Sequence, residues 1–170
     1  LDKRADPSLA VHSQFGKYLP NLHYLDGEWL VAHLEDIFPR QAAMSDYWEV
    51  AWEGYLFRRD FFGSLYEPLK PYYRYALEQL AHGPQGKAGS ELARGRIARH
   101  LSALYWRGIE TLDGEDSLIP LFFEAASDEL RASFIVGLRT ALAEVKPTAD
   151  SEEWYRAKAL WTARVKTAEE

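Results

Sequence analysis

Aromatic side chains are concentrated in one short stretch of the chain. Of its twenty-four aromatic residues (6 Trp, 10 Tyr and 8 Phe), eleven fall within residues 47–75. Each such ring buries a large apolar area, so a cluster of this kind forms either a core or a contact surface. Trp48, Trp52 and Tyr55 recur at the spacing of one helix face. This spacing predicts that these three rings are core, and that the stretch is the structural hub of the fold.

Apolar residues recur at helical spacing along most of the chain. They do so in predicted helices at residues 26–38, 45–59, 90–112, 127–146 and 151–170. Residues able to cap a helix N-terminus stand at several helix starts: Asp26, Ser45, Asp116 or Ser117, Ser127 and Ser151. No segment has the alternating pattern of β-branched residues that is typical of a strand. The sequence therefore predicts an all-α protein.

Prolines and glycines mark the expected breaks. Pro68 and Pro71 stand three residues apart, and a proline inside a helix removes a hydrogen bond and clashes with the preceding turn. We therefore expect a short helix or turn first and a new helix that starts near Pro71. Gly16 and Pro20 are expected to interrupt and then end a weak helix near the start of the chain. Residues 83–89, with three glycines and one proline, predict a loop.

Two of the predicted helices have apolar residues that define a face. In the helix at 90–112, the residues predicted to be buried are Leu92, Ile97, Leu101, Leu104, Tyr105 and Ile109. In the last helix, Trp154, Ala157, Trp161 and Val165 fall on one side. Because an amphipathic helix turns its apolar stripe toward the core, we expect both sets to face inward.

The helices are also arranged in pairs along the sequence. Residues 29–56 and 117–142 each predict a short helix, a serine at the next helix start and a longer helix, and residues 65–109 predict a further pair. Antiparallel pairs of roughly 30 to 45 residues are typical of α-solenoids of the HEAT or armadillo kind. We expect one all-α domain over residues 1–170, built as a short α-solenoid; the alternative is an irregular helical bundle.

Two short motifs carry a resemblance to a known group of domains. They are residues 51–56 (AWEGYL) and residues 65–71 (LYEPLKP). This pattern resembles uncharacterised C-terminal helical domains of large bacterial proteins, where the domain follows a sirtuin-like or nucleotide-hydrolysing module in an arrangement often linked to antiphage defence. The resemblance implies a sensing or scaffolding role, with catalysis in another part of the parent protein. It carries over no catalytic residue.

Composition restricts the location and the partners. The chain has a formal net charge of -6 and no cysteine. An acidic chain is a poor match for phosphates or anionic lipids over its whole surface, and the absence of cysteine fits a reducing cytoplasm. No apolar run approaches the ~20 residues that cross a bilayer. We expect a cytoplasmic protein without membrane contact, and, because the sequence does not begin with Met, a piece of a longer protein.

Catalytic and metal-binding motifs were sought among the histidines and glycines. The five histidines include no pair at i, i+4 and no HExxH. The glycine-rich residues 83–90 (GPQGKAGS) lack the spacing of a phosphate-binding P-loop. An enzyme of another type would need a pocket that combines His33 or His100 with carboxylates. The sequence predicts no catalytic residue, no cofactor and no metal, and so a protein that is not an enzyme.

The leading hypothesis is a non-enzymatic helical-repeat scaffold or protein-protein interaction module. Its partner would be another protein or other domains of its own parent chain. A candidate interaction surface lies in the Gly- and Pro-interrupted connection, where periodicity assigns no face to the rings. The residues of this candidate surface are Arg58, Arg59, Phe61, Phe62 and Tyr66.

A nucleic-acid-binding helical domain is the alternative. Arginines next to exposed rings hold and stack single-stranded nucleic acid. The candidate face is on the helix at 90–112 and consists of Arg94, Arg96, Arg99 and Arg107, with His100 beside them. Amphipathic helices also carry such residues simply as their solvated face.

Overall fold

The structure is a computed structural model that describes residues 7–57, 63–82 and 89–169, with side chains described as far as Arg164. Within these ranges it contains ten α-helices, one 3-10 helix and no strand, which confirms the predicted all-α class. The chain divides into two compact units, Leu1–Ile97 and Ala98–Glu170. The boundary falls inside helix α7 (Glu91–Trp106). The single domain and the α-solenoid arrangement stay predictions.

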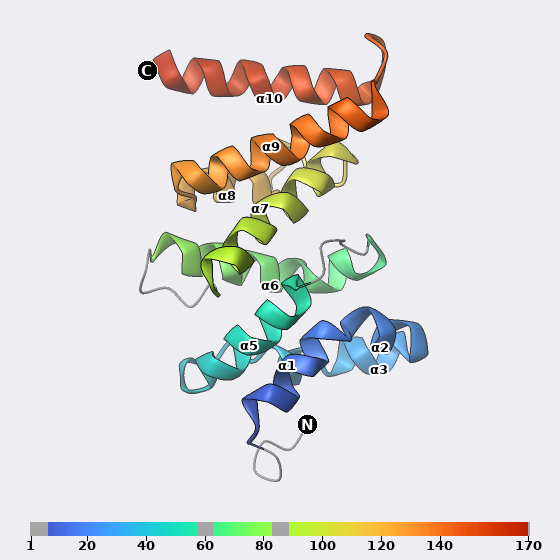
Figure 1. Cartoon of the computed structure of the whole chain (residues 1–170), viewed down its shortest axis with the longest axis vertical. Coiled ribbons are helices and arrows are strands. Elements are labelled where there is room, and N and C mark those ends of the chain that lie inside the picture. Colours follow the sequence, from blue (N-terminus) through green and yellow to red (C-terminus); the bar gives the residue numbers. More distant parts are fainter. Residues whose placement is uncertain (1–6, 58–62, 83–88, 170) are drawn as a thin grey trace. The chain divides into compact units, whose positions relative to one another are not determined.

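The first unit is a sequence of short helices followed by two longer ones (Figure 1). Its elements are α1 (Leu9–Lys17), α2 (Leu19–Leu25), α3 (Gly27–Ala32), α4 (Leu34–Ile37), the 3-10 helix η1 (Ala42–Met44), α5 (Ser45–Leu56), α6 (Gly63–Ala81) and the first part of α7. Asp26 caps α3 as predicted, because its carboxylate accepts a hydrogen bond from the Trp29 amide at 2.9 Å. Ser45 is the first residue of α5 and not its cap, since η1 leads directly into α5.

The predicted aromatic core is confirmed in this unit. Trp48 and Trp52 are 0% exposed, and Tyr55 is 2% exposed. The Trp52 ring meets the Tyr73 ring edge-on at 5.0 Å, a favoured geometry for two aromatic rings. The hydroxyls of Tyr55 and Tyr73 are 3.0 Å apart and satisfy each other inside the core. These rings hold α5 against α6 and are not available as a contact surface.

Helices α1 and α5 cross at two glycines. A Cβ atom added to Gly16 would lie 1.8 Å from the Ala51 carbonyl oxygen, and one added to Gly54 would lie 2.3 Å from the Ser13 carbonyl oxygen. Only residues without a side chain allow the two backbones to approach so closely. The expectation that Gly16 interrupts a helix is therefore wrong: Gly16 lies within α1 and serves helix packing.

The predicted break at the two prolines is also wrong. Helix α6 is continuous from Gly63 to Ala81, with Pro68 and Pro71 inside it. Each proline removes one backbone hydrogen bond at a cost of roughly 3 kcal/mol in a helix interior. Burial of one face of α6 outweighs this cost, and the face consists of Leu65, Tyr66, Leu69, Tyr72, Tyr73, Ala76, Leu77 and Leu80. Pro20, which was expected to end a helix, lies in the first turn of α2.

The second unit contains the remainder of α7, then α8 (Leu118–Ala125), α9 (Asp128–Val145) and α10 (Glu152–Glu169). Of the two candidate caps of α8, Asp116 and Ser117, the cap is Ser117, and Ser151 caps α10 as predicted: their hydroxyls accept from the Ile119 and Trp154 amides. The start of α8 is also held by the buried Glu110, whose carboxylate accepts from the Leu118 amide at 2.6 Å.

The core of the second unit contains stacked phenylalanines, with the Phe122 and Phe134 ring centroids 5.5 Å apart. The predicted inward face of the last helix is wrong. Trp161 is 71% exposed, whereas Leu160, the next residue toward the N-terminus, is 1% exposed. The predicted buried face of the helix at 90–112 is mostly confirmed, because Ile97, Leu101, Leu104 and Tyr105 are buried. Its two end residues are exceptions: Leu92 is exposed, and Ile109, which follows the end of α7, is exposed as well.

Candidate functional site

An apolar groove lies in the second unit between α9 and α10, which run in opposite directions (Figure 1). Its volume is about 480 Å³, within the range of ligand-binding pockets. Helix α9 contributes Arg131, Ala132, Ile135, Leu138, Arg139 and Leu142, helix α10 contributes Ala157, Leu160, Trp161 and Arg164, and α8 contributes Phe123. We call this the α9–α10 groove.

The groove has a buried base and an exposed rim. Phe123, Leu138 and Leu160 are buried and belong to the core of the unit. Ile135 and Trp161, on opposite helices, are exposed although they are large and apolar. Contiguous exposed apolar surface on a folded protein marks a contact site more often than scattered single residues do. The arrangement is suited to hold an apolar body between the two helices.

Two arginines stand together at one end of the groove. The Arg164 guanidinium lies over the Phe123 ring, with its central carbon 4.0 Å from the ring centroid. Both side chains line the groove. Burial lowers the pKa of Arg164, and the positive charge of Arg131 lowers it further. Arg131 also forms an exposed ion pair with Asp128 at 3.3 Å.

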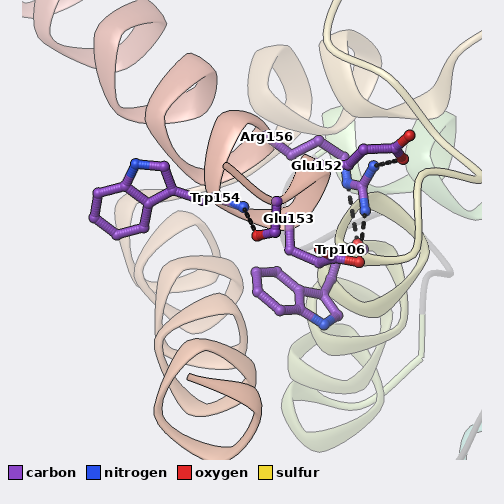
Figure 2. Close-up of polar contacts among 6 residues, drawn as sticks. Trp106, Glu152, Glu153, Trp154 and Arg156 are labelled. Atoms are coloured by element: carbon purple, nitrogen blue, oxygen red, sulfur yellow. Dashed lines mark hydrogen bonds and ion pairs between the residues drawn. The ribbon is translucent and has the colours of Figure 1, made fainter. Parts of the chain in front are cut away.

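Helix α10 is anchored by Arg156, near its N-terminus (Figure 2). Its guanidinium Nε donates to the Trp106 carbonyl oxygen at 3.1 Å, at the end of α7. The same side chain pairs with Glu152 at 3.2 Å and Glu153 at 3.5 Å. The Tyr105 hydroxyl donates to the Arg156 carbonyl oxygen at 2.6 Å. These contacts place the α10 wall of the groove.

The predicted interaction surface is only partly within the described residues. Arg58, Arg59, Phe61 and Phe62 lie outside them. Tyr66 is 1% exposed, because it lies on the buried face of α6 with its ring 5.9 Å from the Tyr73 ring. Tyr66 is therefore a core residue and not part of an exposed surface.

The predicted arginine face on α7 is divided. Arg94 donates to the Gly89 carbonyl oxygen at 3.0 Å, and Arg96 donates to the Leu56 carbonyl oxygen at 2.9 Å. Arg94 is also turned about 140° or more around α7 from Arg96 and Arg99, because each residue advances about 100°. Arg107 follows the last residue of α7. Arg99 and Arg107 are exposed. The four residues do not form one face.

The histidines occupy structural positions. His12 is buried, with Nε2 2.7 Å from the Ile37 carbonyl oxygen, and His100 is buried in the second unit. The Nδ1 atoms of His33 and His82 each face a carbonyl oxygen of their own helix. In the described part of the chain, no group of three or more His, Cys, Asp or Glu residues is placed to hold a metal ion.

Sequence reasoning did not find the α9–α10 groove. A usable signal was present: Ala157, Leu160, Trp161 and Arg164 stand at i, i+3, i+4 and i+7 on α10. The same spacing describes an ordinary core stripe, so it does not by itself separate a groove from a core.

Comparisons of the chain with protein-family models, with curated proteins and with solved structures found no match. Among the residues that the structure describes, no helix is both long enough and apolar enough to cross a membrane.

Proposed function

We propose that this chain is a non-enzymatic protein-interaction module that holds an amphipathic helix of a partner protein in the α9–α10 groove. The observation that carries the proposal is the pair of apolar stripes, one on each wall, with Ile135 and Trp161 exposed at the rim. A helix placed between two such stripes would complete a three-helix packing, the mode by which many grooves take amphipathic helices.

Charge favours an acidic partner helix. The chain as a whole is acidic, with a net charge of -6, yet Arg131, Arg139 and Arg164 line the groove, and no acidic residue lines it among those whose side chains the structure describes. Such local reversal of charge selects partners and speeds their encounter. A partner from the same parent protein is consistent with the scaffolding role that the resemblance of residues 51–56 and 65–71 implies. We also propose the short α-solenoid as the arrangement of the whole chain.

A labelled helical peptide tests this proposal. The peptide has about 18 residues, five helical turns, with leucines at i, i+3, i+4 and i+7 and glutamates on the flanks, and its control is a scrambled peptide without the stripe. Binding is followed by fluorescence anisotropy. Trp161→Ala should weaken binding about 10-fold or more, since truncation of a central aromatic anchor has effects of this size.

The matched control is Trp154→Ala, on the same helix. Trp154 is also exposed but does not line the groove, so this change should leave binding unaltered. Equal binding of the striped and scrambled peptides, or equal weakening by both tryptophan variants, would refute the proposal.

The nucleic-acid alternative rests on the exposure of Arg99 and Arg107. It predicts a shift of labelled single-stranded DNA that weakens with salt and with the change of both arginines to Ala. No shift at low salt would exclude this alternative.

A further inference from the structure

We infer that Arg131 and Arg164 form a carboxylate-binding clamp at one end of the α9–α10 groove, and that the bound helix carries a Glu or Asp that enters it. This inference rests on the proposed function and adds the chemistry that would select the partner. It concerns the α9–α10 groove alone.

Each of the two arginines has a buried N–H group without a hydrogen-bond acceptor. The Nε atoms of Arg131 and Arg164 are both buried, and neither meets an acceptor among the described residues. A buried N–H group without a partner is unfavourable, and native structures seldom keep one without a reason. A carboxylate supplies up to four acceptor positions and matches the planar guanidinium in a two-bond geometry.

The positive charges of Arg131 and Arg164 are poorly compensated. In the described part of the chain Arg164 has no carboxylate partner, and its guanidinium packs over Phe123. Among the described residues, the ion-pair partner of Arg131 is Asp128, whose side chain is 93% exposed, so that ion pair is weak and easily exchanged. Two neighbouring cations repel each other until an anion lies between them. A carboxylate in this place would relieve the repulsion.

The clamp lies within the apolar groove and not on a separate surface. Both arginines line the same groove as Leu138, Leu160 and Trp161. A ligand that fills the groove and also pairs with the two arginines therefore needs an elongated apolar surface with a negatively charged group at one end. An acidic amphipathic helix has this character, whereas a nucleic acid would place a line of phosphates along a groove that is mostly apolar.

The experiment compares peptides that differ at one position. Three versions of the striped peptide carry Glu, Gln or Lys at the position that enters the clamp. One set has this position near the N-terminus of the peptide, and a second set has it near the C-terminus. We expect the Glu peptide to bind about 10-fold or more tightly than the Gln peptide, as charge-assisted bonds predict. The Lys peptide should bind most weakly.

Arginine variants of the protein test whether Arg131 and Arg164 cause the tighter binding of the Glu peptide. Arg164→Gln and, separately, Arg131→Gln should bring the Glu and Gln peptides to nearly equal affinity, while Arg107→Gln, an exposed arginine outside the groove, should keep the full preference. Arg164→Lys should keep only part of it, because an ammonium lacks the planar fork. Circular dichroism checks that each variant is folded.

The outcomes separate the two claims. If all three striped peptides bind equally and better than the scrambled one, the clamp is overturned and the proposed function stands. If no striped peptide binds, both fall. If Arg107→Gln removes the preference as much as Arg164→Gln does, general charge attraction explains it and the clamp is overturned.

Discussion

The crossing of α1 and α5 allows a stability change to be worked out from distances. An ordinary contact with a Cβ atom begins near 3.4 Å. An alanine at position 16 would place its Cβ 1.8 Å from the Ala51 carbonyl oxygen, so these atoms must separate by the difference, about 1.6 Å. For Gly54→Ala the contact with the Ser13 carbonyl oxygen is 2.3 Å, and the required shift is about 1.1 Å. Both obstacles are backbone atoms, which cannot turn aside as a side chain can.

The expected loss follows from two opposing effects. Forcing extra volume into a packed contact typically destabilises by about 1–3 kcal/mol, and a backbone obstacle places these variants at the upper end. Alanine is the better helix former by about 1 kcal/mol, which offsets part of the loss. We expect Gly16→Ala to lower the free energy of unfolding by about 2 kcal/mol, or the melting temperature by roughly 4–8 °C. Gly54→Ala should have a smaller effect.

Gly95→Ala is the matched control. Gly95 lies in α7, and a Cβ added there meets nothing within 4 Å, so only the helix-propensity gain of up to about 1 kcal/mol remains. Urea unfolding followed by circular dichroism measures all three variants. The double variant of Gly16 and Gly54 should be less destabilised than the sum, because one separation of the helices accommodates both methyl groups. A Gly16→Ala protein as stable as Gly95→Ala would refute the close-approach reasoning.

Three further predictions concern polar groups that hold elements of the fold together. Burial raises the pKa of Tyr55 to about 12 and that of Tyr73 well above its ordinary value. The stability linked to the neutral hydroxyls is fully present below pH 10 and is lost as the pH rises toward 12, so the protein should unfold together with the rise in phenolate absorbance. Tyr55→Phe should make the free energy of unfolding depend less on pH in this range. Arg156→Lys keeps the charge but loses the Nε bond to the Trp106 carbonyl, and should lower the urea-unfolding free energy by about 1–2 kcal/mol; no change would mean that this contact does not anchor α10. Glu110→Gln replaces a buried carboxylate that accepts from the Leu118 amide, and should cost about 1–3 kcal/mol in the same measurement. An unchanged free energy of unfolding would mean that the negative charge of Glu110 does not contribute to holding α8.

Three of the predicted helix caps were read correctly, at Asp26, Ser117 and Ser151. Each involves an amide two or three residues away, so the sequence contains both partners of the interaction. The predicted caps at Ser45 and Ser127 do not form: Ser45 lies inside α5, and Ser127 stands at the start of α9 without a capping hydrogen bond. The spacing of Trp48 and Trp52 identified the buried face of α5, because each ring buries a large apolar area when it packs in a core.

Signals that depend on distant residues were misread. Pro68 and Pro71 predict a helix break by local rules, but the burial of one whole face of α6 outweighs the two lost hydrogen bonds. On α10 the two tryptophans suggested the inward face, whereas Leu160 is the buried residue and Trp161 lies at the groove rim. Spacing shows which residues share a face and does not show which face meets a neighbour.

The sequence by itself determined the all-helical class, three of the helix caps and the aromatic core around Trp52, because hydrogen bonding and periodicity act over a few residues. Only the tertiary structure decided that α9 and α10 leave a groove between them, and that Arg131 and Arg164 meet at its end. Those residues are 33 positions apart in the numbering, and their proximity depends on how two helices pack against a shared core. That packing is a sum over many distant contacts, which no single stretch of the chain contains.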